Sequence, residues 1–181
     1  VVPRPGYFSG ALEFNGENYL DLGMIPGIDF HGPLSISFWV YNIDDGANGV
    51  VIAPNLDDEN LNAGFEISIN HIKQVNFVMT SMKEDKEQLR ISTKNRLAPN
   101  KWSHVVITFN GTTKPEAIRI YIDSKPTELD ETIWFDRIKD ELTATITKPK
   151  SIRVGAKASI DHKNRSNGLM RARLDEIMFF D

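Results

Sequence analysis

Cysteine is absent from this chain of 181 residues. Its absence excludes disulfide bonds, thiolate-bound metals and a cysteine nucleophile. It does not identify a compartment, because many bacterial domains outside the cytoplasm also lack cysteine. The length is usual for one domain, and the sequence has no internal repeat and no shift in composition. We therefore expect a single domain over residues 1–181, with a core large enough to need no covalent cross-links.

Long apolar runs and clusters of positive charge are missing as well. No apolar stretch approaches the ~18 residues of a membrane span. The formal net charge is −4, the pI is near 5.6, and lysine and arginine never form a run of five. These values argue against a general polyanion binder. We expect no nucleic-acid partner and no insertion into a membrane.

The pattern that is present is an alternation of apolar and polar residues with a period of two, typical of half-buried β-strands. In LSISFWVYN, Ile36, Phe38 and Val40 face one way, and polar or aromatic residues face the other. Shorter runs of the same kind are GFEISI, QVNFVM, QLRIST, WSHVVITF, AIRIYID and SIRVGA. Turn signals such as Asn-Gly and Asp-Gly separate the runs. The pattern predicts an all-β sandwich or barrel, with one short helix at residues 133–142.

The final strand contains an irregularity. Its apolar residues are Met170, Ala172, Leu174, Ile177 and Phe179. The step from Leu174 to Ile177 is odd, and a strictly pleated strand cannot place two such residues on one face. We therefore expect a β-bulge at Asp175–Glu176, which re-aims the Asp175 side chain.

Six segments follow one another along the chain in the order of a known family. They are GALEFNGENYLDLG, SISFWV, KWSHVVITFNG, IRIYIDSKP, SIRVGA and GLMRARLDEIMFFD. Together they resemble the concanavalin A-like lectin/glucanase superfamily, specifically its laminin-G-like (pentraxin-like) domain. The resemblance covers nearly the whole chain and implies a two-sheet antiparallel jelly roll of about a dozen strands. The family has Asp-Gly where this chain has Asp123-Ser124. We therefore expect a tight glycine turn to be missing and the following loop to run on to Lys150.

A narrower resemblance concerns the path from GFEISI to IRIYIDSKP. It is similar to the laminin-G-like module inside large planctomycete-type proteins that also carry a cytochrome c-like segment. The first residues, VVPRPGYFSG, include no methionine and no signal-peptide pattern, and the last, IMFFD, are those of an apolar strand. We expect this chain to be one module of a larger protein.

The resemblance leaves binding and catalysis open. Family members mostly bind glycans, other proteins or, through partners, membranes, whereas some of the wider superfamily are glycosidases. A retaining glycosidase needs two carboxylates ~5–5.5 Å apart, which the catalytic relatives carry in an alternating acidic triplet. The nearest match is ELDETI, where Glu128 and Asp130 share a face but Thr132 takes the third place. The four histidines show no metal-binding spacing. We expect no enzyme.

Carbohydrate binding is the function that we expect, because sugars stack their C–H faces on flat aromatic rings and pair their hydroxyls with polar side chains. The polar faces of the strands supply both kinds of group. The candidate residues are Trp39, Tyr41, Arg119, Tyr121, Arg171 and Arg173. Taken singly, each ring is more often a seal at the end of a sandwich core than a ligand platform. A mixture of arginine and tyrosine is also an ordinary solvated sheet face.

A structural calcium ion is implied by relatives that hold Ca²⁺ between the first strand pair and the last strand. Ca²⁺ takes several oxygen ligands from carbonyls and carboxylates. The matching residues are Asn15, Gly16 (through its carbonyl), Asn18, Asp21 and Asp175. The plain alternative is that Asn15-Gly16 only forms a hairpin turn and Asp175 only caps a bulge. The acidic residues 57–59 lack the spacing of an EF-hand and suit a solvated loop.

The strand NKWSHVVITFNG places Trp102 and His104 on one face, where they could grip a ligand. The opposite face carries the apolar row Val105, Ile107 and Phe109. Val106 keeps the Trp102 face apolar too, and a strand that is apolar on both sides lies inside the architecture. We predict that Trp102 is largely buried and that His104 has a polar partner.

The sequence thus predicts a non-catalytic recognition module outside the cytoplasm (periplasmic, cell-surface or secreted) that binds a carbohydrate or a glycan-bearing surface. Two alternatives stay open. One is a protein-interaction or spacer module that docks other domains of its parent protein and binds no sugar. The weaker one is a glycosidase.

Overall fold

The computed structural model describes residues 1–26, 32–55, 64–80, 88–112, 114–130, 151–158 and 166–181. These residues form two seven-stranded antiparallel sheets, which we call sheet A and sheet B, and a two-stranded ribbon. Within these ranges the helical residues are confined to two 3₁₀ turns, Ile43–Asp45 (η1) and Pro115–Ala117 (η3). The expected all-β, two-sheet sandwich is confirmed. The helix expected at residues 133–142 lies outside the described residues.

Sheet A combines strands from both ends of the chain. Its order is β1 (Val2–Pro5), β2 (Gly10–Asn15), β16 (Arg171–Phe180), β4 (Leu34–Tyr41), β9 (Trp102–Phe109), β10 (Ile118–Ile122) and β11 (Lys125–Pro126). The last strand therefore lies near the middle of the sheet, between the first hairpin and β4. Its two pairings join the end of the chain to strands from the first quarter of the sequence.

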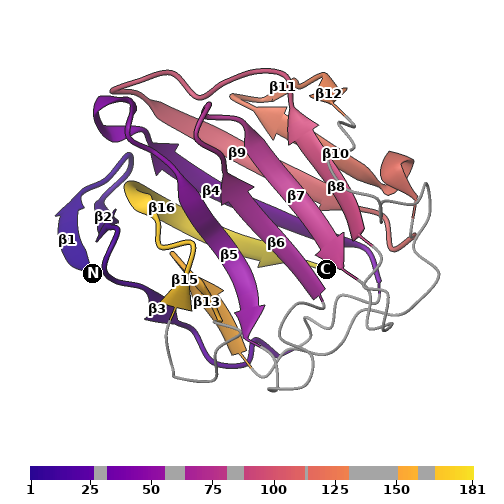
Figure 1. Cartoon of the computed structure of the whole chain (residues 1–181), viewed down its shortest axis with the longest axis horizontal. Helices are drawn as coiled ribbons and strands as arrows, with labels where there is room; N and C mark the ends of the chain where they lie inside the picture. The colour runs from indigo at the N-terminus through magenta and orange to yellow at the C-terminus, as the bar shows by residue number, and fades with distance from the viewer. Residues whose placement is uncertain (27–31, 56–63, 81–87, 113, 131–150, 159–165) are drawn as a thin grey trace.

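Sheet B is built mainly from consecutive strands. Its order is β12 (Leu129–Asp130), β8 (Gln88–Thr93), β7 (Val75–Thr80), β6 (Gly64–Ile69), β5 (Gly49–Asn55), β13 (Ser151–Val154) and β3 (Leu20–Asp21). The ribbon pairs β14 (Lys157–Ala158) with β15 (Ser166–Asn167). Figure 1 shows the sheets as stacked layers, with β5 to β8 of sheet B in front of β4, β9 and β16 of sheet A.

The core lies between the two sheets, and the alternation along each strand decides which side chains enter it. From sheet A the buried rows include Ile36, Phe38, Val40, Val105 and Ile107. From sheet B they include Ile67, Ile69, Phe77, Met79 and Ile91. Burial of each of these side chains contributes ~1.5–3 kcal/mol. The intervening side chains project from the outer faces of the two sheets, where a ligand could contact them.

Two local expectations about the backbone can be compared with the structure. The bulge is confirmed, because the pairing of β16 with β4 shifts register between Asp175 and Met178, and Glu176 has a φ of 47°. The expectation of a missing tight turn is wrong. Asp123 and Ser124 have φ values of 52° and 64° and form a two-residue hairpin between β10 and β11 without glycine.

The stretch expected to be one long loop after that turn contains two short strands, β11 and β12, within its described part. In the described ranges, the structure has no helix with the length and apolar character needed to cross a membrane.

Candidate binding site

All six residues predicted to bind carbohydrate lie on the outer face of sheet A, because their neighbours along each strand fill the core. The register places Arg173 of β16 beside Tyr41 of β4, and Tyr41 beside Trp102 of β9. Trp39 lies in the next row of the same face. The sequence alternation therefore assigned these side chains to the correct side of the strands.

Trp39 packs against three rings of the chain itself. The Tyr7 ring stacks on it with centroids 3.6 Å apart and planes 12° apart. The His104 ring stacks on it at 4.8 Å and 25°, and Phe8 meets it edge-on at 5.9 Å. The turn between β1 and β2 thus covers the tryptophan with the chain's own aromatic side chains.

Tyr41 and Arg173 are also engaged by other residues. The Tyr41 ring lies against Trp102 at 5.4 Å, and the Arg173 guanidinium lies 5.4 Å from the Tyr41 ring centroid. Arg173 Nε donates to Glu13 Oε2 at 2.7 Å, and Arg4 Nε approaches the same oxygen at 3.2 Å. The hydrogen bonds from Arg173 and Arg4 lower the pKa of Glu13 below its ordinary value. Both arginines of this cluster therefore share one acidic partner.

Arg119 and Tyr121 lie apart from that cluster, on β10 near the edge of sheet A. They line an open groove of about 250 Å³ together with Glu116, Pro126 and Leu129. The structure thus places two of the six predicted residues in one groove, and Trp39, Tyr41 and Arg173 in a filled cluster. The sixth, Arg171, is exposed at the start of β16.

The Trp102–His104 pair behaves as a structural element. Trp102 is partly buried, and the predicted polar partner of His104 is confirmed as Ser37, whose Oγ lies 2.8 Å from Nε2. The backbone N–H of His104 donates to Asp123 Oδ1 at 2.9 Å, and Lys101 Nζ donates to Oδ2 at 3.0 Å. Burial alone would raise the pKa of Asp123, but these two donors outweigh it and lower the pKa below its ordinary value.

Asp175 links the first hairpin to the last strand by hydrogen bonds, an arrangement that we call the Asp175 clasp. Its Oδ2 accepts the backbone N–H groups of Tyr7 at 2.8 Å and Phe8 at 3.2 Å, and its Oδ1 accepts that of Glu176 at 2.9 Å. A Cβ atom added at Gly6 would collide with the same carboxylate. The bulge aims Asp175 at this turn, which explains why the register breaks here.

The predicted calcium ligands are distributed over both sheets. Asn15 ends β2, and Gly16, with a φ of 88°, begins the turn that follows. Asp175 lies four residues beyond Arg171, the β16 partner of Asn15, which puts it ~13 Å along the strand. Asp21 lies on β3 of sheet B. Asp175 and the turn at Asn15 are therefore not brought together.

Side-chain oxygen atoms of Asn15, Asn18 and Asp21 already accept protein hydrogen bonds. Asn15 Oδ1 accepts the Glu17 N–H at 3.0 Å, Asn18 Oδ1 accepts the Asn15 N–H at 3.4 Å, and Asp21 Oδ2 accepts the Ser151 hydroxyl at 3.0 Å. The described ranges contain no group of three or more His, Asp or Glu side chains arranged to hold a metal. A cation at these positions would compete with the existing hydrogen bonds, and calcium binding stays a prediction.

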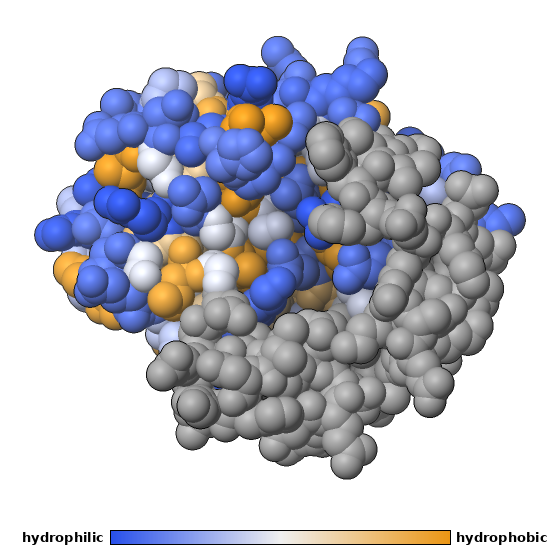
Figure 2. Space-filling view, viewed as in Figure 1, coloured by the Kyte–Doolittle hydropathy of each residue, from blue (hydrophilic) through white to orange (hydrophobic). Residues whose placement is uncertain are grey.

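The outer face of sheet B carries a polar lattice that the sequence reasoning missed. Its three rows across β6, β7 and β8 are Gly64–Thr80–Gln88, Glu66–Val78–Arg90 and Ser68–Asn76–Ser92. All these residues except Gly64 and Val78 are polar. Figure 2 shows this side of the molecule, where hydrophilic residues lie beside paler and hydrophobic ones. The central strand β7 is buried on both faces.

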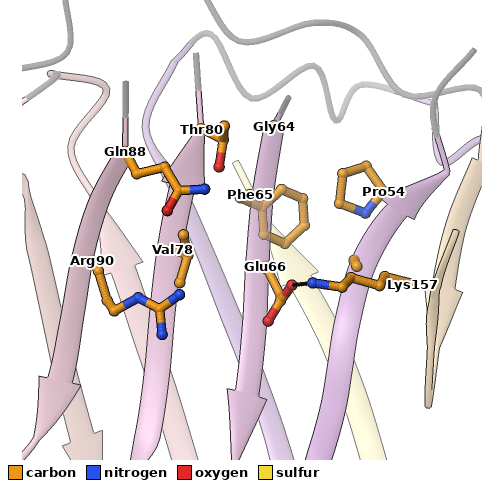
Figure 3. Close-up of a pocket in the computed structure, with 10 residues that line it drawn as sticks. Pro54, Gly64, Phe65, Glu66, Val78, Thr80, Gln88, Arg90 and Lys157 are labelled. Carbon is orange, nitrogen blue, oxygen red and sulfur yellow. Dashed lines mark hydrogen bonds and ion pairs between the residues drawn. The ribbon is translucent and has the colours of Figure 1, made fainter. Parts of the chain in front are cut away.

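A hollow of about 90 Å³ lies over this lattice. Figure 3 shows Gln88 and Arg90 of β8 on one side and Glu66 and Lys157 on the other, with Val78 between them. Lys157 Nζ donates to Glu66 Oε2 at 2.9 Å, so these two opposite charges neutralise each other. The hollow thus has an apolar residue between two polar walls.

Three buried polar atoms of the described residues on this face have no hydrogen-bond partner, and one of them, Arg153 Nε, lies 3.6 Å from the Asp21 carboxylate. The other two are Arg90 Nε, a donor, and Asn76 Oδ1, an acceptor. Asn76 is only 5% exposed and lies one row from Arg90 on the neighbouring strand. Nearly all buried polar atoms in folded proteins are paired, so unpaired atoms of opposite sense on one face indicate a place for a water or a ligand group.

The signal for this lattice is present in the sequence. The runs GFEISI, QVNFVM and QLRIST predicted strands, and their alternate residues are polar. Periodicity identifies these side chains as outward-facing, but the pairing register is what brings Glu66, Val78 and Arg90 into one row.

Comparisons with known proteins identify the fold. A family model described as the concanavalin A-like lectin/glucanases superfamily matches residues 14–180. Domains LG4-5 of the mouse laminin α1 chain share 16% identity at a TM-score of 0.65, covering 99% of this chain and 44% of that chain. The heptameric SAP-like pentraxin of Limulus polyphemus shares 12% identity at a TM-score of 0.59, covering 92% of this chain and 73% of that chain.

A third similar structure is that of botulinum neurotoxin type C, whose cell entry is described as dependent on two ganglioside molecules. It shares 16% identity at a TM-score of 0.59, covering 99% of this chain and 40% of that chain. This chain therefore spans less than half the length of the laminin and neurotoxin chains that it matches. Comparison with curated protein sequences gave no match.

Proposed function

This chain belongs to the concanavalin A-like lectin/glucanases superfamily, and we propose that it is a non-catalytic recognition module that binds carbohydrate in the hollow on the outer face of sheet B. The observation that carries the proposal is the unpaired polar atoms beside that hollow, Arg90 Nε and Asn76 Oδ1. Ligand sites combine apolar surface with a few polar groups that fix orientation. A sugar matches this combination, because its C–H face can lie on Val78 and its hydroxyls can pair with the walls.

The non-catalytic part of the proposal follows from the carboxylates. Glycoside hydrolysis uses a pair of carboxylates that flank the scissile bond. Among the described residues that line the hollow, Glu66 is the one carboxylate, and Lys157 already pairs with it. The similar structures are a laminin region, a neurotoxin that interacts with gangliosides and a pentraxin. They support recognition, and a location outside the cytoplasm is proposed on the same basis.

Affinity electrophoresis and a glycan array with neutral and acidic polysaccharides test the proposal. Gln88→Ala should weaken any binding that the wild type shows, because it removes an amide from the hollow. Arg119→Ala and Tyr121→Ala are the matched variants on sheet A, and we expect them to bind as the wild type does. If Arg119→Ala and Tyr121→Ala weaken binding and Gln88→Ala does not, the sugar binds in the groove beside β10. If the wild type binds none of the polysaccharides, the proposed function is wrong.

A second candidate function is docking of another protein, as in the alternative drawn from the sequence. The observation in its favour is a set of exposed apolar side chains on the outer face of sheet A and its first hairpin. They are Tyr7, Phe8, Met178 and Phe180, which are 49%, 68%, 39% and 50% exposed. Phe8→Ser together with Phe180→Ser should abolish such docking and leave carbohydrate binding unchanged, which separates the two functions.

A further inference from the structure

We infer that the hollow on sheet B selects sugars that carry a carboxylate, and that the Arg90 guanidinium binds this carboxylate. The inference rests on the proposed function, because it names the class of ligand for the same hollow. It starts from an imbalance of charge. Glu66 and Lys157 form an ion pair at 2.9 Å, whereas no carboxylate of the described residues pairs with Arg90.

The environment of Arg90 makes this imbalance informative. The residue is partly buried, and its Nε is buried without a partner. A cation withdrawn from water without a counter-charge is unfavourable, so positions of this kind are usually filled by ion pairs. A guanidinium presents its N–H donors as a planar fork that fits the two oxygens of a carboxylate. A bound carboxylate would supply the missing negative charge.

The row Glu66–Val78–Arg90 sets the dimensions of the subsite. Neighbouring strands are ~4.8 Å apart, so the backbones of β6 and β8 are ~9.6 Å apart at this row. Val78, which is 6% exposed, lies between the two charged side chains. A sugar ring packed on Val78 would therefore have one edge toward the Glu66–Lys157 pair and the other toward Arg90.

Asn76 adds a second requirement. Its Oδ1 is an acceptor without a partner, one row beyond Arg90 on the neighbouring strand. A hydroxyl next to the carboxylate could donate to Asn76 while the carboxylate accepts from Arg90. A hollow of about 90 Å³ is small beside typical ligand pockets of ~300 Å³ or more. It suits one unit of a longer chain rather than a whole small molecule.

The negative charge of the whole chain is compatible with this reading. A net charge of −4 without basic runs argues against binding through many anionic groups at once. Recognition by Arg90 needs only one carboxylate per bound unit. The affinity should therefore depend weakly on salt, unlike that of a polyanion binder, which releases many counterions.

The experiment compares carboxylated polysaccharides with their own neutral forms. Polygalacturonate, alginate and hyaluronan are each tested beside their carboxyl-reduced products by isothermal titration calorimetry. We expect the wild type to prefer at least one carboxylated form by about tenfold or more, and Arg90→Gln to remove that preference. Arg90→Lys should restore part of it, because the charge returns without the fork. Arg119→Gln, an exposed arginine on sheet A, is the control and should retain the full preference.

The outcomes separate the two claims. Equal binding of acidic and reduced forms, unaffected by Arg90→Gln, would overturn the inference and leave carbohydrate binding in place. Absence of binding to any polysaccharide, acidic or reduced, would overturn both. Loss of the preference in Arg119→Gln but not in Arg90→Gln would also overturn it. Thermal unfolding of each variant establishes that a lost preference does not come from a lost fold.

Discussion

Replacing Asp175 with alanine tests the clasp between the first hairpin and the last strand. The variant loses three hydrogen bonds to a carboxylate that is 5% exposed. A hydrogen bond to a charged group contributes ~1.5–3 kcal/mol. The donors of Tyr7 and Phe8 lie in an exposed turn and regain water in the variant, so we take about 1 kcal/mol for each bond. The expected loss is about 3 kcal/mol in the free energy of unfolding, or ~6–12 °C in Tm.

Thermal unfolding followed by circular dichroism measures this loss. Tryptophan fluorescence gives a second readout, because Trp39 loses the Tyr7 ring that covers it and its emission should move to longer wavelength. Glu176→Ala is the control, since its exposed side chain belongs to the same bulge and should change stability by only ~0.5 kcal/mol. A Tm for Asp175→Ala within about 2 °C of the wild type would refute the clasp.

Three further predictions concern calcium, pH and the turn after β10. If Asp175 serves only the clasp, EDTA should leave the wild-type Tm unchanged, whereas a fall in Tm that added Ca²⁺ reverses would favour the predicted calcium site. The pKa values of Glu13 and Asp123 are lowered from 4.5 and 3.8 in the folded protein. The two carboxylates therefore stabilise the fold above pH 4.5 and 3.8, and this stability is lost as the pH falls through their lower folded pKa values. Urea unfolding at several pH values should show this decline, and Glu13→Gln should make it shallower. Ser124→Gly should raise stability by ~0.5–1 kcal/mol, because φ is 64° there and glycine favours this turn; a lower Tm would contradict the turn geometry.

The fold was predictable because period-two alternation and turn residues carry it. Ile36, Phe38 and Val40 enter the core as their spacing indicated. The bulge was predictable for the same reason, since only an extra residue reconciles Leu174 with Ile177. Alternation is a local property, so one sequence suffices to see it.

The tight turn at Asp123-Ser124 was not predictable from its residue types. Serine rarely adopts a positive φ, and the absence of glycine suggested a longer loop. The structure offsets this cost through contacts distant in sequence. The Asp123 carboxylate accepts hydrogen bonds from His104 and Lys101 of the neighbouring segment. The sequence gives no indication of these contacts until the pairing of β9 with β10 is known.

The candidate site differs from the prediction for a similar reason. Aromatic and basic residues such as Trp39 and Arg173 suggest a carbohydrate groove when they are considered as residue types. The first hairpin folds back over that face, and the Tyr7 ring stacks on Trp39. Because Tyr7 and Trp39 are far apart in the sequence, their stacking follows from tertiary structure alone.

The two outer faces of the sandwich are therefore distinguished by the partners of their partly buried arginines. On sheet A, Glu13 lies between Arg4 and Arg173, and the Arg173 guanidinium also covers a tyrosine ring. On sheet B, Glu66 has a lysine partner, and Arg90 has no acidic partner among the described residues. A guanidinium that already has an acidic partner gains less from a bound carboxylate than a partly buried guanidinium without one, which gains a counter-charge. Ligand recognition is accordingly expected on the face with fewer aromatic rings, because its polar groups still lack partners.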